Sequence, residues 1–163
     1  MNYHNITTED LLNGDGLRTV LWVAGCSHHC PFCQNPETHD PASGIPFDND
    51  AYKELLEDLS ETYISGLTLS GGDPLYVGNR ETLTELAKDI KDKFPNKTIW
   101  CYTGFLYEEV ADLDIMQYID VLVDGKFIEA LKDNNLHWVG SSNQRVIDIP
   151  ETRKQGVIVL HCT

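Results

Sequence analysis

The stretch "RTVLWVAGCSHHCPFC", residues 18–33, joins a hydrophobic run to three cysteines that fall within eight residues. A run over 18–25 that is apolar from Val20 onward is typical of a strand that is buried on both faces of a parallel sheet. Cys26, Cys30 and Cys33 follow in a C-x3-C-x2-C spacing, with gaps of four and three residues. On a loop that leaves a strand, this spacing lets the three thiols turn toward one point. The stretch therefore predicts a buried strand that ends in a loop where three sulfur atoms can meet.

Outward from this stretch, hydrophobic runs alternate with amphipathic segments. Apolar residues at helical spacing predict helices over 48–61 and 79–94, the first capped by Asp48 or Asn49 and the second followed by Pro95. This order is typical of βα units around a mainly parallel sheet, so we predict an α/β fold. The other expected elements are strands over 65–72, 97–104 and 118–125, a weaker helix over 108–116, a candidate fifth strand over 144–149, and an unplaced apolar segment over 156–162.

Unusual residues follow each of the predicted strands. The strand over 18–25 runs into the cysteines, and "SGGDP" (70–74), "CYTGF" (101–105) and "VDGKF" (123–127) follow the next three. The carboxyl ends of parallel strands lie at one edge of a sheet, and α/β proteins bind their ligands there. The sequence therefore predicts an active site at this edge.

Composition narrows the classes of function. With 163 residues, 41% hydrophobic and 23% charged, the chain is typical of one soluble domain with a real core. A net charge of −14 argues against nucleic acid as a partner, because phosphate binding needs a basic face. The polar N-terminal segment and the short run "VLWVAG" predict neither a secretory signal nor a membrane span. We therefore expect a cytoplasmic protein with one domain over 1–163, including a C-terminal tail over 148–163 of undefined structure.

Four uses of the cysteines are open on spacing alone: disulfides, a zinc site, a thiol–disulfide redox pair and an iron–sulfur cluster. The chain has five cysteines, which cannot all pair, and cytoplasmic thiols more often serve metals or catalysis. A zinc site needs four ligands, so His28 or His29 would have to close it from within the cysteine loop. "CPFC" (30–33) matches a redox pair but leaves the third cysteine unused. Three thiolates on a four-iron cluster leave one iron open to a substrate or cofactor, which accounts for three cysteines.

The motif C-x3-C-x-aromatic-C, formed by Cys26, Cys30, Phe32 and Cys33, resembles the signature of the radical S-adenosylmethionine (SAM) enzymes. A second motif, "LSGGDPL" (69–75), resembles the glycine-rich element that meets the methionine amino group of SAM in that superfamily. Glycines let backbone carbonyls approach an ammonium group, and a carboxylate can assist. Asp73 stands where the superfamily more often has Glu, which is a departure from its pattern.

Further motifs narrow the resemblance to the activating proteins of anaerobic (class III) ribonucleotide reductases. It spans residues 3–147 and implies a shortened, open partial βα barrel of the radical SAM type with a mainly parallel sheet. The motifs that carry it are "NGDGLRT" (13–19), "CPFCQNPETHD" (30–40), "SGGDPL" (70–75), "LVDGKF" (122–127) and "GSSNQR" (140–145).

The resemblance implies a reaction and its participants. One reduced 4Fe–4S cluster would cleave SAM to methionine and a 5′-deoxyadenosyl radical, which abstracts hydrogen from a backbone glycine of the anaerobic ribonucleotide reductase. The catalytic subunit of that reductase would be the partner, and an electron donor such as flavodoxin would reduce the cluster. No nucleic acid and no membrane are expected as partners.

The resemblance also implies roles for individual residues. Cys26, Cys30 and Cys33 would hold the cluster, and His28 and His29 would then be ordinary loop residues. We expect no catalytic residue beyond the cluster and SAM. The implied SAM contacts are Phe32, Cys33 and Gln34 at the adenine, Gly71, Gly72 and Asp73 at the methionine end, and Tyr102, Thr103 and Gly104 at the ribose or adenine.

Other polar residues have two interpretations. Arg18 is either a surface charge or a group that faces the site, and Asp124 with Lys126 is either a structural ion pair or a pair with a role on the substrate side. "GSSNQR" is either a polar loop or a family signature with an unassigned task. Cys162 could reach the cluster, although we expect that it does not.

Two other functions are compatible with the motifs. A radical SAM enzyme with a small-molecule substrate, such as the 7-carboxy-7-deazaguanine synthases, would need a substrate-binding extension that is not evident here. A zinc-binding interaction module would be colourless, whereas a 4Fe–4S protein is brown.

Overall fold

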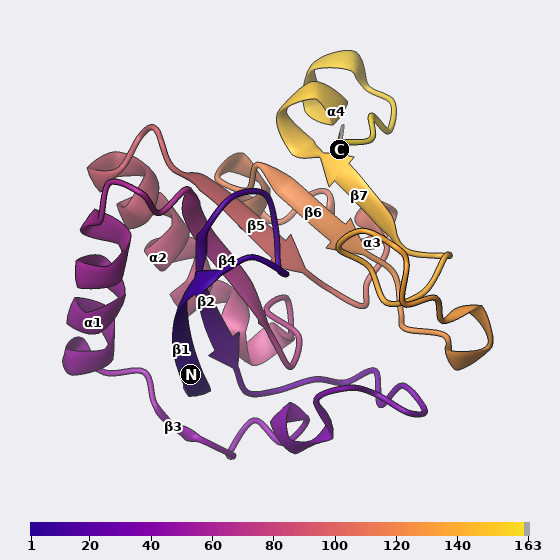
Figure 1. Cartoon of the computed structure of the whole chain (residues 1–163), viewed down its shortest axis with the longest axis horizontal. Helices are drawn as coiled ribbons and strands as arrows, with labels where there is room; N and C mark the ends of the chain where they lie inside the picture. The colour runs from indigo at the N-terminus through magenta and orange to yellow at the C-terminus, as the bar shows by residue number, and fades with distance from the viewer. Residues whose placement is uncertain (162–163) are drawn as a thin grey trace.

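The structure, a computed structural model, describes residues 1–161, and its strands form one open sheet in the order β3-β1-β2-β4-β5-β6-β7 (Figure 1). The four central strands are parallel, and the strands beyond them on both sides are antiparallel. The predicted α/β class with a mainly parallel sheet is therefore confirmed. The strands are β1 (Asn2–Asp10), β2 (Arg18–Val23), β3 (Ile45–Pro46), β4 (Gly66–Gly71), β5 (Thr98–Tyr102), β6 (Val121–Asp124) and β7 (Arg145–Asp148).

Two long helices, α1 (Asn49–Ser60) and α2 (Arg80–Lys93), match the predicted ranges closely. The Asp48 side chain accepts a hydrogen bond from the Ala51 amide at 3.0 Å, so Asp48 is the N-cap of α1. The shorter helices are α3 (Tyr107–Val110), α4 (Ile149–Gln155) and four 3-10 turns, η1 (Pro36–Thr38), η2 (Val77–Asn79), η3 (Asp114–Gln117) and η4 (Glu129–Leu131).

The continuous helix expected over 108–116 is wrong, because the chain is extended at Leu113 between α3 and η3. Val110, Ile115 and Met116 are all buried. Residues five and six positions apart do not share one face of a helix. The break at Leu113 lets both turns bury their apolar side chains.

The two faces of the sheet carry different side chains. One face packs on α1 and α2 in the main hydrophobic core, to which the strands contribute Leu21, Leu69 and Cys101. The other face carries a smaller cluster around Trp100, Val121 and Val123. Helices α1 and α2 cover only the first face, whereas Trp138 and Val139 pack against the cluster on the second face.

Arg18 lies on this second face and is fully buried, so it is not a surface charge. Its guanidinium donates to Thr68 Oγ1 at 2.8 Å and to the Thr98 carbonyl at 2.8 Å, and lies 5.6 Å from the centre of the Trp100 ring. Burial lowers the pKa of Arg18 to about 10. Arg18 starts β2, whereas the cysteines follow its other end, so Arg18 links strands and does not reach the cysteines.

Strand β1 was not expected from the sequence. Its residues are mostly polar, and among them only Tyr3 is buried. The strand forms because its backbone pairs with β2 over Tyr3 to Asp10. At the other end of the chain, the apolar segment after α4 pairs through Leu160 with Ile147 of β7. Cys162 lies outside the described residues. No helix within residues 1–161 has the length and apolar character that crossing a membrane requires.

Candidate active site

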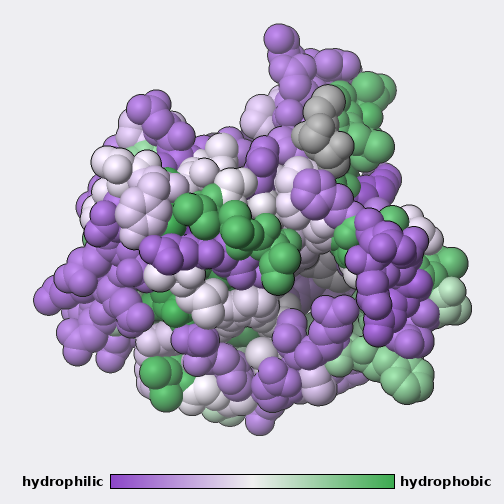
Figure 2. All heavy atoms as spheres, in the orientation of Figure 1, coloured by the Kyte–Doolittle hydropathy of each residue, from purple (hydrophilic) through white to green (hydrophobic). Residues whose placement is uncertain are grey.

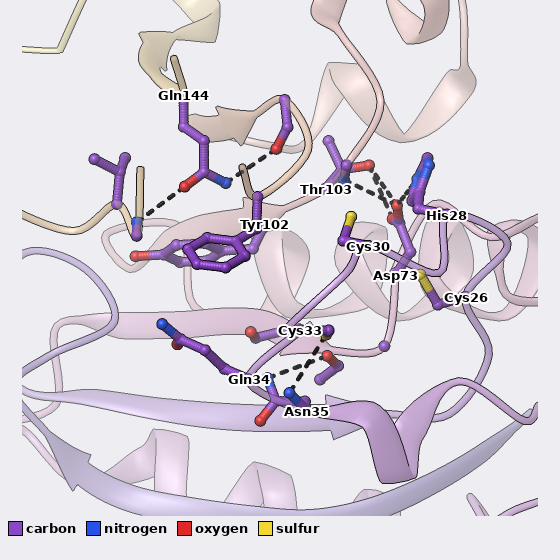
Figure 3. A pocket seen from close by; sticks show the side chains of 18 of the residues that line it. Cys26, His28, Cys30, Cys33, Gln34, Asn35, Asp73, Tyr102, Thr103 and Gln144 are labelled. Atoms are coloured by element: carbon purple, nitrogen blue, oxygen red, sulfur yellow. Dashed lines mark hydrogen bonds and ion pairs between the residues drawn. The ribbon is translucent and has the colours of Figure 1, made fainter. Parts of the chain in front are cut away.

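A cavity of about 570 Å³ lies at the carboxyl ends of the parallel strands, where the predicted motifs meet. The segments after β2, β4, β5 and β6 all contribute to its lining (Figure 3). Beside it, Figure 2 shows a hydrophobic patch in the middle of the visible face, where Figure 1 places the β1–β2 connection. Leu11 and Leu12 of this connection are 67% and 80% exposed, and Leu12 also lines the cavity.

The cysteine loop, which we define as residues 24–35, has no regular secondary structure. The Gly25 amide donates to the Thr38 carbonyl at 2.7 Å, and the Cys26 amide donates to the His39 carbonyl at 3.0 Å. Further along, His29 and Phe32 have positive φ angles of 49° and 59°. These angles are uncommon outside glycine and turn the loop sharply. The loop is therefore fixed at its start and tightly bent in its middle.

The three loop cysteines are free thiols that line the same cavity. Burial is the main cause that raises the pKa of the Cys26 thiol. Within residues 1–161, no three His, Cys, Asp or Glu side chains stand close enough together to hold a metal ion. The donor set still fits an iron–sulfur cluster in its chemistry, because such clusters bind cysteine thiolates and this loop brings three to one cavity. Holding one requires the bent loop to draw the sulfur atoms together.

The glycine motif after β4 lies directly against the start of the cysteine loop. The Asp73 amide donates to the Gly25 carbonyl at 2.7 Å. A Cβ atom on Gly72 would lie 2.5 Å from the same carbonyl oxygen, so a side chain has no room there. Gly71 and Gly72 both line the cavity beside the cysteines. The motif therefore serves close packing of two loops and also offers backbone atoms to the cavity.

The Asp73 carboxylate, which the resemblance assigns to SAM, is 1% exposed and is surrounded by donors of the protein itself. Its Oδ1 accepts from the Leu75 amide and the Thr103 hydroxyl, both at 2.8 Å. Its Oδ2 lies 3.0 Å from the Gly104 amide and 2.6 Å from His28 Nε2. Figure 3 shows His28 and Thr103 converging on this carboxylate. Asp73 therefore connects the cysteine loop with the end of β5.

Tyr102 and Gln34, which the resemblance assigns to SAM, line the cavity, whereas Phe32, assigned to SAM with them, does not. The Tyr102 hydroxyl is buried and has no hydrogen-bond partner among residues 1–161. Burial also raises the pKa of Tyr102. A buried hydroxyl of this kind is a ready partner for a polar ligand atom. The Phe32 side chain is 77% exposed on the surface of the cysteine loop, away from the site that the sequence suggested.

The wall of the cavity after β6 begins at the predicted strand end "VDGKF", but its extent through residues 133–144 was not predicted. This segment, residues 125–144, is here called the β6–β7 excursion, and it ends in the motif "GSSNQR". Gln144 Oε1 accepts from the Gly140 and Ser141 amides at 2.9 and 3.1 Å, and Gln144 Nε2 donates to the Gly125 carbonyl at 3.0 Å. Asn143 Nδ2 donates to the Lys126 carbonyl at 2.8 Å. The motif therefore closes the excursion onto the end of β6.

Among the described residues, Asp124 pairs with Arg145, and the structural ion pair considered between Asp124 and Lys126 is not formed. Asp124 is fully buried, and its carboxylate binds Arg145, with Arg145 Nη2 2.6 Å from Oδ2. Arg145 also reaches Glu108 at 2.8 Å. Opposite residues in the β6–β7 pair place Asp124 beside Arg145, which sequence spacing cannot show.

Comparison with known proteins gives one consistent family. A family model described as a 4Fe-4S single cluster domain matches residues 12–147. An anaerobic ribonucleoside-triphosphate reductase-activating protein of Enterobacteria phage T4 is 45% identical over 146 residues, which cover 90% of this chain and 93% of that relative. Proteins of the same name from Escherichia coli (strain K12) and Haemophilus influenzae are 43% and 42% identical, over 90% and 88% of this chain and 97% and 96% of their own lengths.

Proposed function

The chain belongs to the family of anaerobic ribonucleoside-triphosphate reductase-activating proteins and carries its 4Fe-4S single cluster domain, and from this premise we propose that it is a radical SAM activase of that reductase. When bound, a reduced 4Fe–4S cluster would supply the electron that splits SAM into methionine and a 5′-deoxyadenosyl radical, which takes a hydrogen atom from a backbone glycine of the reductase. The observation that carries this proposal is the meeting of three free cysteines and the glycine motif in one cavity.

The residues of the chain would bind and orient the cofactors. Cys26, Cys30 and Cys33 would hold the cluster. The backbone of Gly71 and Gly72 would face the methionine end of SAM, because both glycines line the cavity next to the cysteine loop. Three residues at the end of β5 and one from the cysteine loop would contact the nucleoside: Tyr102, Thr103, Gly104 and Gln34.

Access for a polypeptide substrate follows from the open sheet. A cavity of about 570 Å³ is within the range of small-molecule sites. The face of the sheet that lacks α1 and α2 leaves this cavity open to the outside. We propose that the whole chain is one domain with the partial barrel of radical SAM enzymes, and that a loop of the reductase enters from this open face. We also propose that the protein is cytoplasmic and that an electron donor such as flavodoxin reduces its cluster.

Anaerobic reconstitution tests the proposal directly. We expect about four irons per chain, as a 4Fe–4S cluster requires, and cleavage of SAM after reduction. Mixing the loaded protein with the reductase, SAM and reductant should then give a glycyl-radical doublet in the EPR spectrum. One tightly held zinc without SAM cleavage would refute the proposed activity. SAM cleavage without the glycyl signal would retain the radical chemistry and reject the reductase as the substrate.

A further inference from the structure

Two adjacent histidines of the cysteine loop differ sharply in their surroundings. The His28 side chain is 7% exposed and lies against the end of β5, whereas His29 is exposed at the bend of the loop. His28 Nε2 is 2.6 Å from Asp73 Oδ2. Because a carboxylate accepts hydrogen bonds, the imidazole donates from Nε2. His29 packs edge-on against His39, with ring centres 5.2 Å apart, so of the two only His28 is buried and hydrogen-bonds to a carboxylate of another segment.

The His28 ring lies closely packed between Phe105 and Gly104. The ring packs edge-on against Phe105, with ring centres 4.5 Å apart. On another side, a Cβ atom added to Gly104 would lie 2.5 Å from His28 Cδ2, so the imidazole fits only beside glycine at this position. Gly104 therefore makes room for His28, in addition to donating its amide to Asp73.

The carboxylate of Asp73 has no free position for a further strong donor. A carboxylate offers about four lone-pair sites. The Leu75 amide and the Thr103 hydroxyl occupy Oδ1, while the Gly104 amide and His28 occupy Oδ2. An ammonium group of SAM would have to displace one of these donors, each of which would then be left unpaired in a buried place.

We propose that His28 positions the cysteine loop by binding Asp73, and that Asp73 is a positioning residue which does not contact SAM. The loop is held at its start by backbone bonds, at its end by Asn35 Nδ2, which donates to the Gly71 carbonyl at 3.4 Å, and between Cys26 and Cys30 by the His28 side chain. The consequence of this inference, that His28 and Asp73 place the cluster ligands, rests on the proposed function. The contact between His28 and Asp73 does not depend on that function.

The first test is hydrogen exchange in the whole chain without cluster or SAM, which does not depend on the proposed activity. His28→Ala should speed amide exchange over residues 26–33 by about tenfold or more, and His29→Ala, the matched control, should not. His28→Gln keeps a donor near the Nε2 position and should restore part of the protection. Equal exchange in the His28→Ala and His29→Ala variants would overturn the inference even if the protein proves to be an activase.

The second test separates a positioning role of Asp73 from a direct SAM contact. If Asp73 positions the loop, Asp73→Asn should speed exchange over residues 26–33 without SAM, and the double variant with His28→Ala should exchange no faster than the faster single variant. In the reconstituted protein, both single variants should change the EPR spectrum of the reduced cluster before SAM is added. A variant Asp73→Asn with unchanged exchange and spectrum, but with SAM affinity reduced tenfold, would assign Asp73 to SAM and refute the proposal.

Discussion

The cysteine loop and the β6–β7 excursion are two irregular segments that line one cavity, and they are held in different ways (Figure 3). The excursion is held by its own side chains, because Ser141, Asn143 and Gln144 form hydrogen bonds with backbone groups of the same segment. The three cysteines of the cysteine loop form no disulfide, although Cys33 Sγ accepts from the Asn35 amide at 3.4 Å, and the loop is anchored in its middle by His28, whose partner Asp73 belongs to another segment.

This difference follows from what each wall contributes to the site. A side chain that satisfies its own loop cannot also bind a ligand without leaving a polar group unpaired. The excursion therefore forms a self-supporting wall, whereas the cysteine loop keeps its ligands available and takes its stability from β4 and β5. We expect variants in the two walls to have separable effects.

The largest effect is expected at the ligands of the cysteine loop. Cys30→Ala should abolish cleavage of SAM, because a cluster with two protein ligands is not held in place. The amount of 5′-deoxyadenosine after reduction, measured by chromatography, checks this. Cys101→Ala is the matched control: Cys101 is fully buried in the core, and the variant should retain its iron and its turnover. Retained turnover in Cys30→Ala would show that the cluster lies elsewhere.

The anchor of the cysteine loop should matter most for stability. Asp73→Ala leaves the donors of Leu75, Thr103 and Gly104 without an acceptor inside the protein. We expect the free energy of unfolding to fall by about 3–5 kcal/mol, the range for breaking a buried charged network. Urea denaturation of the protein without cofactors measures it, with the exposed Asp112→Ala as control. A loss no larger than that of the control would contradict the anchoring role.

Removal of the Gln144 side chain should loosen the excursion without loosening the cysteine loop. Gln144→Ala removes the bonds to Gly125, Gly140 and Ser141, at a cost of about 1–3 kcal/mol. Hydrogen exchange over residues 126–140 should accelerate by about tenfold to a hundredfold. Exchange in the cysteine loop should stay unchanged. Faster hydrogen exchange in both the excursion and the cysteine loop would show that they are one cooperative unit and would contradict their separate anchoring.

The smallest effect concerns the contact between Arg145 of β7, which directly follows the excursion, and Glu108 of α3. The hydrogen bond from Arg145 is the main cause that lowers the pKa of Glu108 from its ordinary value of 4.5. A lowered carboxyl pKa stabilises the fold above the ordinary value, and this contribution is lost as the pH falls through the lowered pKa. Because Glu108 is largely exposed, screening limits the contribution to less than about 1 kcal/mol.

Glu108→Gln should therefore flatten the loss of stability between about pH 5 and about pH 3. Urea midpoints across this range measure the slope. Glu129→Gln changes an exposed carboxylate of the excursion itself and should leave the slope as it is in the parent protein. Identical slopes in the Glu108 and Glu129 variants would show that the contact with Arg145 has no influence.

Much of the fold is readable from local patterns. The strands β2, β4 and β5 and the helices α1 and α2 were predicted close to their observed bounds, because apolar periodicity and capping residues act within a few positions. Strand β1 was missed, since its pairing with β2 depends on backbone groups and not on apolar side chains. The interrupted helix after β5 was missed because its two turns bury residues on different faces.

In the candidate site, too, some features follow from local sequence patterns and others only from long-range contacts. Sequence spacing by itself determined that Cys26, Cys30 and Cys33 follow a buried strand, and the order of strands implied that the glycine motif and "CYTGF" share its edge. Only the tertiary structure decided that His28 is buried while His29 is exposed, since the two are chemically equal in the sequence. Their difference arises from Asp73, 45 positions away from His28, and such a contact depends on how separate strands pack. The spacing of the cysteines thus predicts the cluster ligands, whereas long-range packing determines which residue holds their loop in place.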